Sequence, residues 1–149
     1  MTAIDHVTNA GALPSLAATI QFSARRQGML AHNVANVSTP NFQQKDADVA
    51  GFQAMLSRAI DDRRARTGGQ HGDLTLRPTR TVGFGPGGSM RLKPTDAAGR
   101  HGVLTHDRNN RDLERLMQDI AENQGVFRTA TELMRNVSGT MRAAITERV

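Results

Sequence analysis

The chain of 149 residues contains no cysteine, tryptophan or tyrosine, so its five phenylalanines are its whole aromatic content. Without cysteine, the chain can form neither disulfides nor thiolate metal sites. Aromatic side chains are the largest contributors to a hydrophobic core, so their scarcity, together with 14 glycines, disfavours a thick, self-contained globule. A chain that buries little surface alone often gains stability from partners. A small bundle packed with leucine, methionine and alanine also fits this composition.

Secretion signals and membrane spans are missing as well. The N-terminal residues 1–6 lack the basic segment followed by an apolar segment that defines a cleavable signal peptide. No apolar run approaches the ~20 residues needed to cross a bilayer. We therefore expect no transmembrane segment, and a protein that is either cytosolic or leaves the cytosol without a cleaved signal.

The chain is basic, with a formal net charge of +5 and a pI near 11.2. Such an excess can indicate nucleic acid, an acidic partner or an anionic membrane surface. The basic residues, including the run at 63–66, are spread along the chain and rarely lie beside aromatics that could stack on bases. We expect no nucleic-acid partner, and a small basic helical nucleic-acid-binding module remains the alternative hypothesis.

Apolar residues recur at alternating steps of three and four near the N-terminus, which predicts an amphipathic helix over about 10–36. Alanines at steps of seven beside this stripe would let another helix approach closely. Pro40 ends the helix because it lacks an amide hydrogen, and Asn36 or Asn41 can make the turn because asparagine tolerates positive φ. The expected assembly surface of this helix consists of Leu13, Leu16, Ile20, Leu30 and Val34.

The strongest pattern lies at the C-terminus, where an unbroken three-four alternation without proline predicts a helix over about 110–147. This helix would be ~55 Å long at 1.5 Å per residue, and without a partner it would expose its apolar stripe. The 3.5-residue period indicates lengthwise packing against other helices, with polar residues in the seam expected to set the register. The expected assembly interface comprises Asn110, Leu113, Leu116, Ile120, Asn123, Gln124, Phe127, Met134, Val137 and Met141.

Between these helices, residues 38–105 are heterogeneous, with a short helix expected over about 50–62. Glycine-rich stretches at 67–73 and 83–88 adjoin brief alternations at 74–76 and 90–92, which are typical of short strands. We predict a mainly α fold, in which long N- and C-terminal helices pack as an antiparallel coiled-coil-like pair. The middle segment is expected to be extended and loop-rich with at most a little β structure, and residues 1–149 to form a single domain.

No group of residues predicts catalysis, a cofactor or a metal site. His101 and His106 lie in a glycine-containing loop without a helical face or a third ligand at a useful spacing. The glycines at 83–88 lack the following lysine and serine or threonine of a phosphate-binding loop. No serine lies in a Gly-x-Ser-x-Gly context. We therefore expect a protein that is not an enzyme and needs no cofactor.

Two segments resemble a known family. Residues 35–42, Ala-Asn-Val-Ser-Thr-Pro-Asn-Phe, resemble the Ala-Asn-x-x-Thr-Pro-Gly-Tyr signature near the N-terminus of bacterial flagellar rod and hook proteins. Residues 106–114, followed by Met117 and residues 121–124, are similar to a C-terminal pattern of the proximal rod members. Here Asn41 and Phe42 replace Gly and Tyr, while Lys45, Asp46 and Asp48 continue the likeness. The turn-motif residues carried over are Asn33, Ala35, Asn36, Thr39, Pro40 and Phe42.

The resemblance implies a structural subunit of the flagellar basal body rod. Such subunits leave the cytoplasm through the flagellar type III export apparatus, which needs no cleaved signal, and assemble on the periplasmic side. Their terminal helices pair within a subunit, forming the axial core, and pack against neighbours. The implied partners are other rod proteins, further copies of this chain, the rod adaptor FliE, the membrane-embedded MS ring and the export gate proteins.

Overall fold

The computed structural model describes residues 11–69, 71–96 and 113–146. In these ranges the helices are α2 (Leu13–Ala35), α3 (Val49–Thr67) and α4 (Leu113–Thr146). Strand β1 (Lys45–Asp46) pairs antiparallel with β4 (Thr95–Asp96), and β2 (Val82–Phe84) pairs antiparallel with β3 (Met90–Leu92). A 3-10 turn, η1 (Pro86–Gly88), lies at the tip of the second pair.

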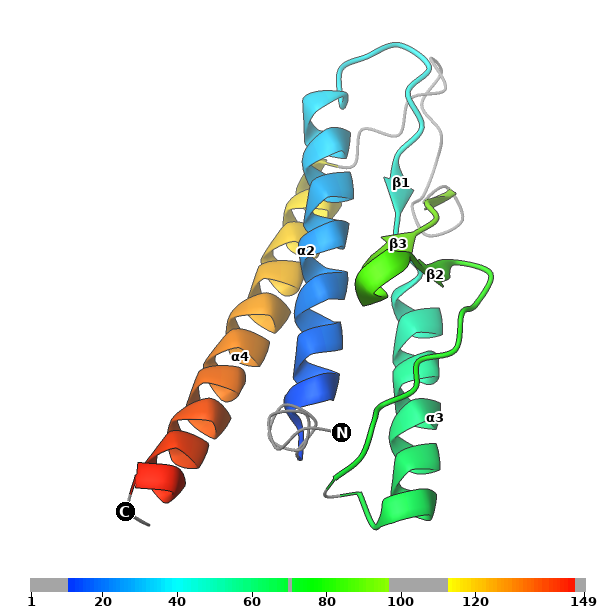
Figure 1. Cartoon of the computed structure of the whole chain (residues 1–149). Coiled ribbons are helices and arrows are strands. Elements are labelled where there is room, and N and C mark those ends of the chain that lie inside the picture. Colours follow the sequence, from blue (N-terminus) through cyan, green and yellow to red (C-terminus); the bar gives the residue numbers. More distant parts are fainter. Residues whose placement is uncertain (1–10, 70, 97–112, 147–149) are drawn as a thin grey trace.

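Figure 1 shows α2 in the middle, with α4 along one side and α3 with the strands along the other. Helices α2 and α4 run in opposite directions and form an extensive contact. The predicted mainly α fold, with an antiparallel pair of long terminal helices and little β structure, is confirmed. The termini of the expected C-terminal helix, residues 110–112 and 147, lie outside the described residues.

The apolar core lies between α2, α3 and the β2–β3 hairpin. Phe22 of α2 stacks on Phe52 of α3, with ring centroids 4.0 Å apart and an interplanar angle of 12°. Two aromatic rings in this geometry combine large area burial with a favourable ring contact. The buried cluster consists of Ala18, Phe22, Ala47, Phe52, Met55, Val82 and Met90. Within the described part of the chain, α4 contributes no residue to it.

Helix α3 has recognisable signals at both ends. The Asp48 carboxylate accepts a hydrogen bond from the Gly51 amide at 2.9 Å, which caps the first turn. At the other end Gly68 adopts φ +71°, and its amide donates to the Arg64 carbonyl at 2.9 Å. The helix expected over about 50–62 therefore continues to Thr67, because no residue before Gly68 stops it.

The two alternating stretches of the middle segment differ in the structure. Residues 90–92 form β3 as expected, and the glycine-rich stretch 83–88 contains the end of β2 and the turn that follows it. Residues 74–76 are extended but belong to no ladder in the described ranges. Among the described helices, none combines the length and apolarity required for a bilayer span.

Candidate assembly interface

A buried ion-pair network joins α2, β1 and α4. The Arg26 guanidinium binds Asp46 through two bonds, Nε to Oδ1 at 2.9 Å and Nη2 to Oδ2 at 2.7 Å. Its Nη2 also reaches Oδ1 of Asp119 on α4 at 3.3 Å. Burial alone would lower the pKa of Arg26, but hydrogen bonding and charge attraction from Asp46, with a smaller contribution from Asp119, raise it above its ordinary value. The cation thus stays charged while it connects three elements.

A second polar contact fixes the register of α4 on α2. The Asn123 side chain, 3% exposed, donates from Nδ2 to the Ser23 carbonyl at 3.0 Å and to Oε1 of Gln27 at 2.9 Å. A buried amide is costly unless it is hydrogen-bonded, so any slip of the helices would leave it unpaired. The predicted seam residue Asn123 therefore acts within the subunit.

Apolar packing between α2 and α4 is narrow. Leu116 and Ala130 are 2% and 4% exposed, and together with Asn123 they are the buried residues of α4 in the described part. These three positions are seven apart, the spacing of one side of a coiled-coil seam. None of them lies beyond the middle turn of α4, and Figure 1 shows the C-terminal end of the helix standing apart from α2.

The structure divides the predicted C-terminal interface into two sets. Leu116 and Asn123 face the subunit's own α2, and Ile120, Met134, Val137 and Met141 are half-buried. Leu113, Gln124 and Phe127 are exposed, together with large apolar residues outside the predicted interface, which are Met117, Val126, Leu133 and Ile145. Asn110 lies outside the described residues.

The predicted N-terminal interface is mostly half-buried. Leu30 is 1% exposed, whereas Leu13, Leu16, Ile20 and Val34 are half-buried. A row of small residues on α2 is more open, with Ala24, Gly28, Ala31 and Ala35 all exposed. Steps of four and three place these residues on one face of the helix, where small side chains permit close approach of another helix.

A groove of about 440 Å³ lies between α2, at the Ala24 end of the small-residue row, and the exposed flank of α4. Ala24 and Gln27 line it from α2, and Gln124, Phe127 and Arg128 line it from α4. Phe127, at 38% exposure, is the large apolar residue on its wall. The groove therefore combines close backbone access on one helix with an aromatic side chain on the other.

The turn motif after α2 returns the chain along that helix. The Asn33 side chain is 2% exposed and pairs with the backbone of Lys45, accepting from its amide at 3.1 Å and donating to its carbonyl at 2.7 Å. This two-way pairing imitates a strand ladder and attaches β1 to the end of α2. Asn33 thus has a structural role inside the subunit.

The reversal itself uses the remaining motif residues. Asn36 caps α2 through a bond from its side chain to the His32 carbonyl at 2.9 Å, and its carbonyl accepts the Thr39 amide at 2.9 Å. Asn41 adopts φ +58°, so it is the asparagine that makes the left-handed turn, whereas Asn36 has φ −110°. Phe42 contacts the His32 ring edge to face, with centroids 5.6 Å apart. Ala35 and Pro40, like Thr39, are exposed.

Sequence reasoning missed the ion-pair network. Arg26 interrupts the mostly apolar face of α2, and such a charge on a core face is a signal for a buried partner. Asp46 lies in the segment that continued the family likeness, which singled it out without showing its role. Nothing in the sequence places Asp119 beside these two residues, because that contact depends on how the helices are aligned.

The arrangement defines a class of protein, a helical subunit whose terminal helices pair and still expose apolar surface. The chain is 32% identical to the flagellar basal body rod protein FlgB of Borrelia hermsii over 111 residues, which cover 72% of this chain and 76% of the relative. No family model matches the chain. The chain therefore belongs to the FlgB family of flagellar basal body rod proteins, a structural class rather than an enzyme class.

Proposed function

We propose that this protein is a structural subunit of the flagellar basal body rod that assembles by packing the exposed face of its α2–α4 pair against neighbouring subunits. The observation that carries this proposal is the apolar surface of α4. Leu113, Met117, Phe127 and Ile145 are 44%, 50%, 38% and 58% exposed along one flank of the helix. An apolar row this long on one helix is typical of a protein–protein contact.

The neighbouring surface of α2 suits the same contact. Its row of small residues, Ala24, Gly28, Ala31 and Ala35, is exposed, and Ala24 lines the same groove as Phe127. A helix of an adjacent subunit can approach the backbone of α2 closely there, while its own side chains cover the flank of α4. Contacts of this kind between identical or related subunits are heterologous and extend into helical arrays rather than closed pairs.

The wider setting follows from family membership. We infer that the subunit leaves the cytoplasm by type III export and reaches the periplasmic side of the basal body. Its partners there are copies of itself, other rod proteins, the adaptor FliE, the MS ring and the export gate. The absence of cysteine suits this route, since such a chain cannot be trapped by disulfides in an oxidising compartment.

The test is charge placement on the exposed flank of α4. In a strain whose chromosomal copy is deleted, a Met117→Glu/Phe127→Glu variant is expected to abolish swimming and to leave no rod in purified basal bodies. The cause is two carboxylates buried at subunit contacts without partners. The matched control is Gln118→Glu/Thr129→Glu, which adds the same charge at exposed positions on the opposite side of α4.

Two further measurements make the outcome decisive. Circular dichroism of the purified variants must show the wild-type helix content, and immunoblots of periplasmic fractions must show normal export. A flank variant that folds, is exported and supports full swimming would refute this surface. Leu116 is unsuitable for the same test, because it is already covered by α2 within the subunit and its substitution would disturb the fold.

A further inference from the structure

Basic residues are spread along the chain, but its net positive charge lies in one region, residues 58–93. This region contains eight arginines and lysines and three aspartates, a net charge of +5 that equals the charge of the whole chain. Basic residues elsewhere are balanced by an equal number of acidic ones. Seven of the eight basic side chains in the region are exposed, Arg63 being the buried one. The side of the molecule that carries α3 and the hairpin therefore has the larger net positive charge and attracts anions.

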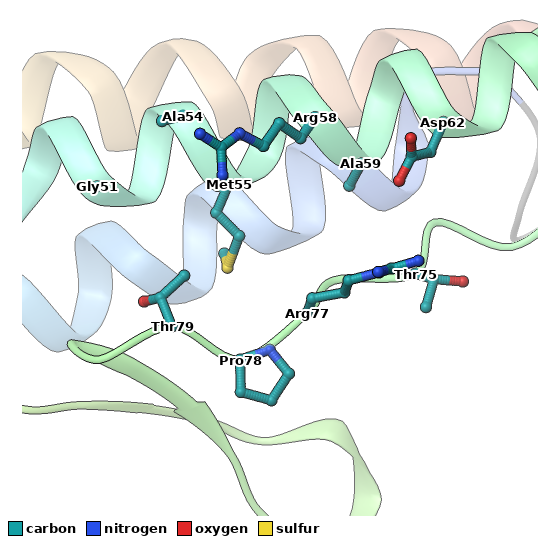
Figure 2. Close-up of a pocket in the computed structure, with 10 residues that line it drawn as sticks. All are labelled: Gly51, Ala54, Met55, Arg58, Ala59, Asp62, Thr75, Arg77, Pro78 and Thr79. Carbon is teal, nitrogen blue, oxygen red and sulfur yellow. The ribbon is translucent and has the colours of Figure 1, made fainter.

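A groove of about 590 Å³ lies within this region, between α3 and the extended segment that runs beside it. Figure 2 shows Met55 pointing from the helix toward the segment, which forms the other wall and includes Pro78. Arg58 lies on the helix wall and Arg77 on the segment wall. A second hollow of about 390 Å³ shares Arg77 with the first and continues it toward the end of α3.

Both arginines of the groove are available to a ligand. Within the described ranges, neither Arg58 nor Arg77 makes a side-chain hydrogen bond or an ion pair, and both are exposed. A guanidinium presents a planar fork of donors that fits a carboxylate through two parallel bonds. Among the described residues that line the groove, Asp62 is the only carboxylate, so their net charge stays positive.

The wall formed by the extended segment also has unused main-chain groups. In the part of the chain that the structure describes, no backbone hydrogen bond joins residues 74–77 to another segment. Leu74 and Leu76 are half-buried while Thr75 and Arg77 are exposed, which is the alternation of a strand lying on a core. Unpaired amides and carbonyls of this kind bind an extended peptide, as an added strand, better than they bind a helix.

We propose that this groove binds an extended acidic peptide segment of a partner protein, with its carboxylates on Arg58 and Arg77 and an apolar side chain against Met55 and Pro78. The groove lies on the other side of α2 from the exposed α4 flank, so it leaves the assembly surface free. The partner is a different protein rather than a second copy, because the exposed acidic residues of α3 and α4 in the described ranges, such as Asp61, Glu114 and Glu132, lie on helices and cannot form an extended strand.

The experiment uses the full chain and a fluorescein-labelled peptide of four Asp-Val repeats, followed by fluorescence anisotropy at 0.15 M salt. The peptide is expected to bind, and a peptide with asparagine in place of aspartate is expected not to bind. Arg58→Glu/Arg77→Glu should weaken binding by about tenfold or more, since it removes two charge-assisted contacts. The matched control is Arg64→Glu/Arg80→Glu, which makes the same charge change at exposed arginines outside the groove and should weaken binding by less than about threefold. Hydrogen exchange should show slower exchange of the Thr75 and Arg77 amides when the peptide is bound.

Each other outcome overturns the proposal. Equal loss in the two variants would mean general attraction to a basic surface. No binding at 1 mM peptide would mean that the groove has no such ligand. Tighter binding to phosphatidylglycerol vesicles, lost equally in both variants, would assign the basic side to a lipid surface. The experiment does not depend on rod assembly, so its failure and the failure of the swimming test are separate results.

Discussion

The two sides of α2 are held to the rest of the subunit in different ways. On the α3 side, Phe22 stacks on Phe52 within a continuous apolar cluster that also includes the β2–β3 hairpin. On the α4 side, directional polar bonds at Arg26 and Asn123 accompany a narrow apolar contact. One side therefore resembles a domain core, and the other resembles an interface with a defined register.

Because of this difference, the α3 side mainly affects the stability of the subunit, and the α4 side mainly affects how α4 is aligned on α2. Burial of large apolar side chains is roughly proportional to area and has little directional preference. A typical hydrogen bond contributes only about 0.5–1.5 kcal/mol to stability, but leaving its groups unpaired costs more, so it selects one alignment. We expect the α3 side, which holds the buried apolar cluster, to contribute more of the folding free energy. The α4 side sets the position of a helix whose remaining apolar flank is available to neighbours.

The largest effect is expected from Phe22→Ala, on the α3 side. Removing a buried ring in contact with Phe52 should lower the free energy of unfolding by about 3–5 kcal/mol. Urea denaturation followed by circular dichroism measures this loss. A change below 1 kcal/mol would mean that the apolar cluster is not what stabilises the subunit.

A somewhat smaller effect is expected from Asp46→Ala, at the junction of the two sides. The substitution leaves the buried Arg26 guanidinium with only its longer contact to Asp119, and uncompensated buried charges cost about 3 kcal/mol. Urea denaturation again measures the change. The double variant Arg26→Met/Asp46→Leu should recover most of the loss, because well-packed apolar residues often replace a buried ion pair without penalty. If the double variant is no more stable than Asp46→Ala, the ion pair contributes through something other than charge compensation.

A local effect is expected from Asn123→Ala, on the α4 side. Loss of the bonds to Ser23 and Gln27 should destabilise the docking of α4 by about 1–2 kcal/mol while leaving the α3 side unchanged. Hydrogen exchange with mass spectrometry distinguishes the two sides. Amides of α4 should exchange faster and those of α3 at the wild-type rate. Equal acceleration in both helices would show that the two sides of α2 unfold as one unit and are not stabilised separately.

The sequence predicted the elements better than the contacts between them. The terminal helices follow from their periodicity, and the turn after α2 follows from Pro40 and Asn41, because these signals are local in the chain. The groups that connect the elements were predicted only in part. Asn123 was placed correctly in a seam, but the seam lies inside the subunit, and Asp119 gave no signal at all. Which face of a long amphipathic helix meets its own chain depends on alignment in space, and periodicity alone does not determine it.

The C-terminal stripe was therefore predicted as one surface, whereas the structure divides its residues between those that α2 covers and those that stay exposed. The prediction treated every third or fourth position of α4 as equivalent. In the structure, Leu116 is covered by α2, whereas Phe127 is exposed. A straight α-helix has 3.6 residues per turn, whereas the apolar stripe repeats every 3.5 residues. The stripe therefore drifts around α4, and successive stripe residues face α2 to different extents. Burial in the subunit distinguishes residues that hold the pair together from residues left for neighbours.

The smallest effect on the isolated subunit is expected from Ile145→Gln. Ile145 is 58% exposed in the part of α4 beyond its buried positions, so the substitution should change the free energy of unfolding by less than about 0.5 kcal/mol. Urea denaturation beside the Phe22→Ala variant measures it on the same scale. If this apolar residue belongs to a surface that is covered only in the assembly, the same variant should still impair swimming in a deletion strain. A loss of 2 kcal/mol or more in the isolated subunit would mean that the distal part of α4 is packed within the subunit after all. Full swimming with unchanged stability would instead restrict the assembly surface to the flank around Phe127.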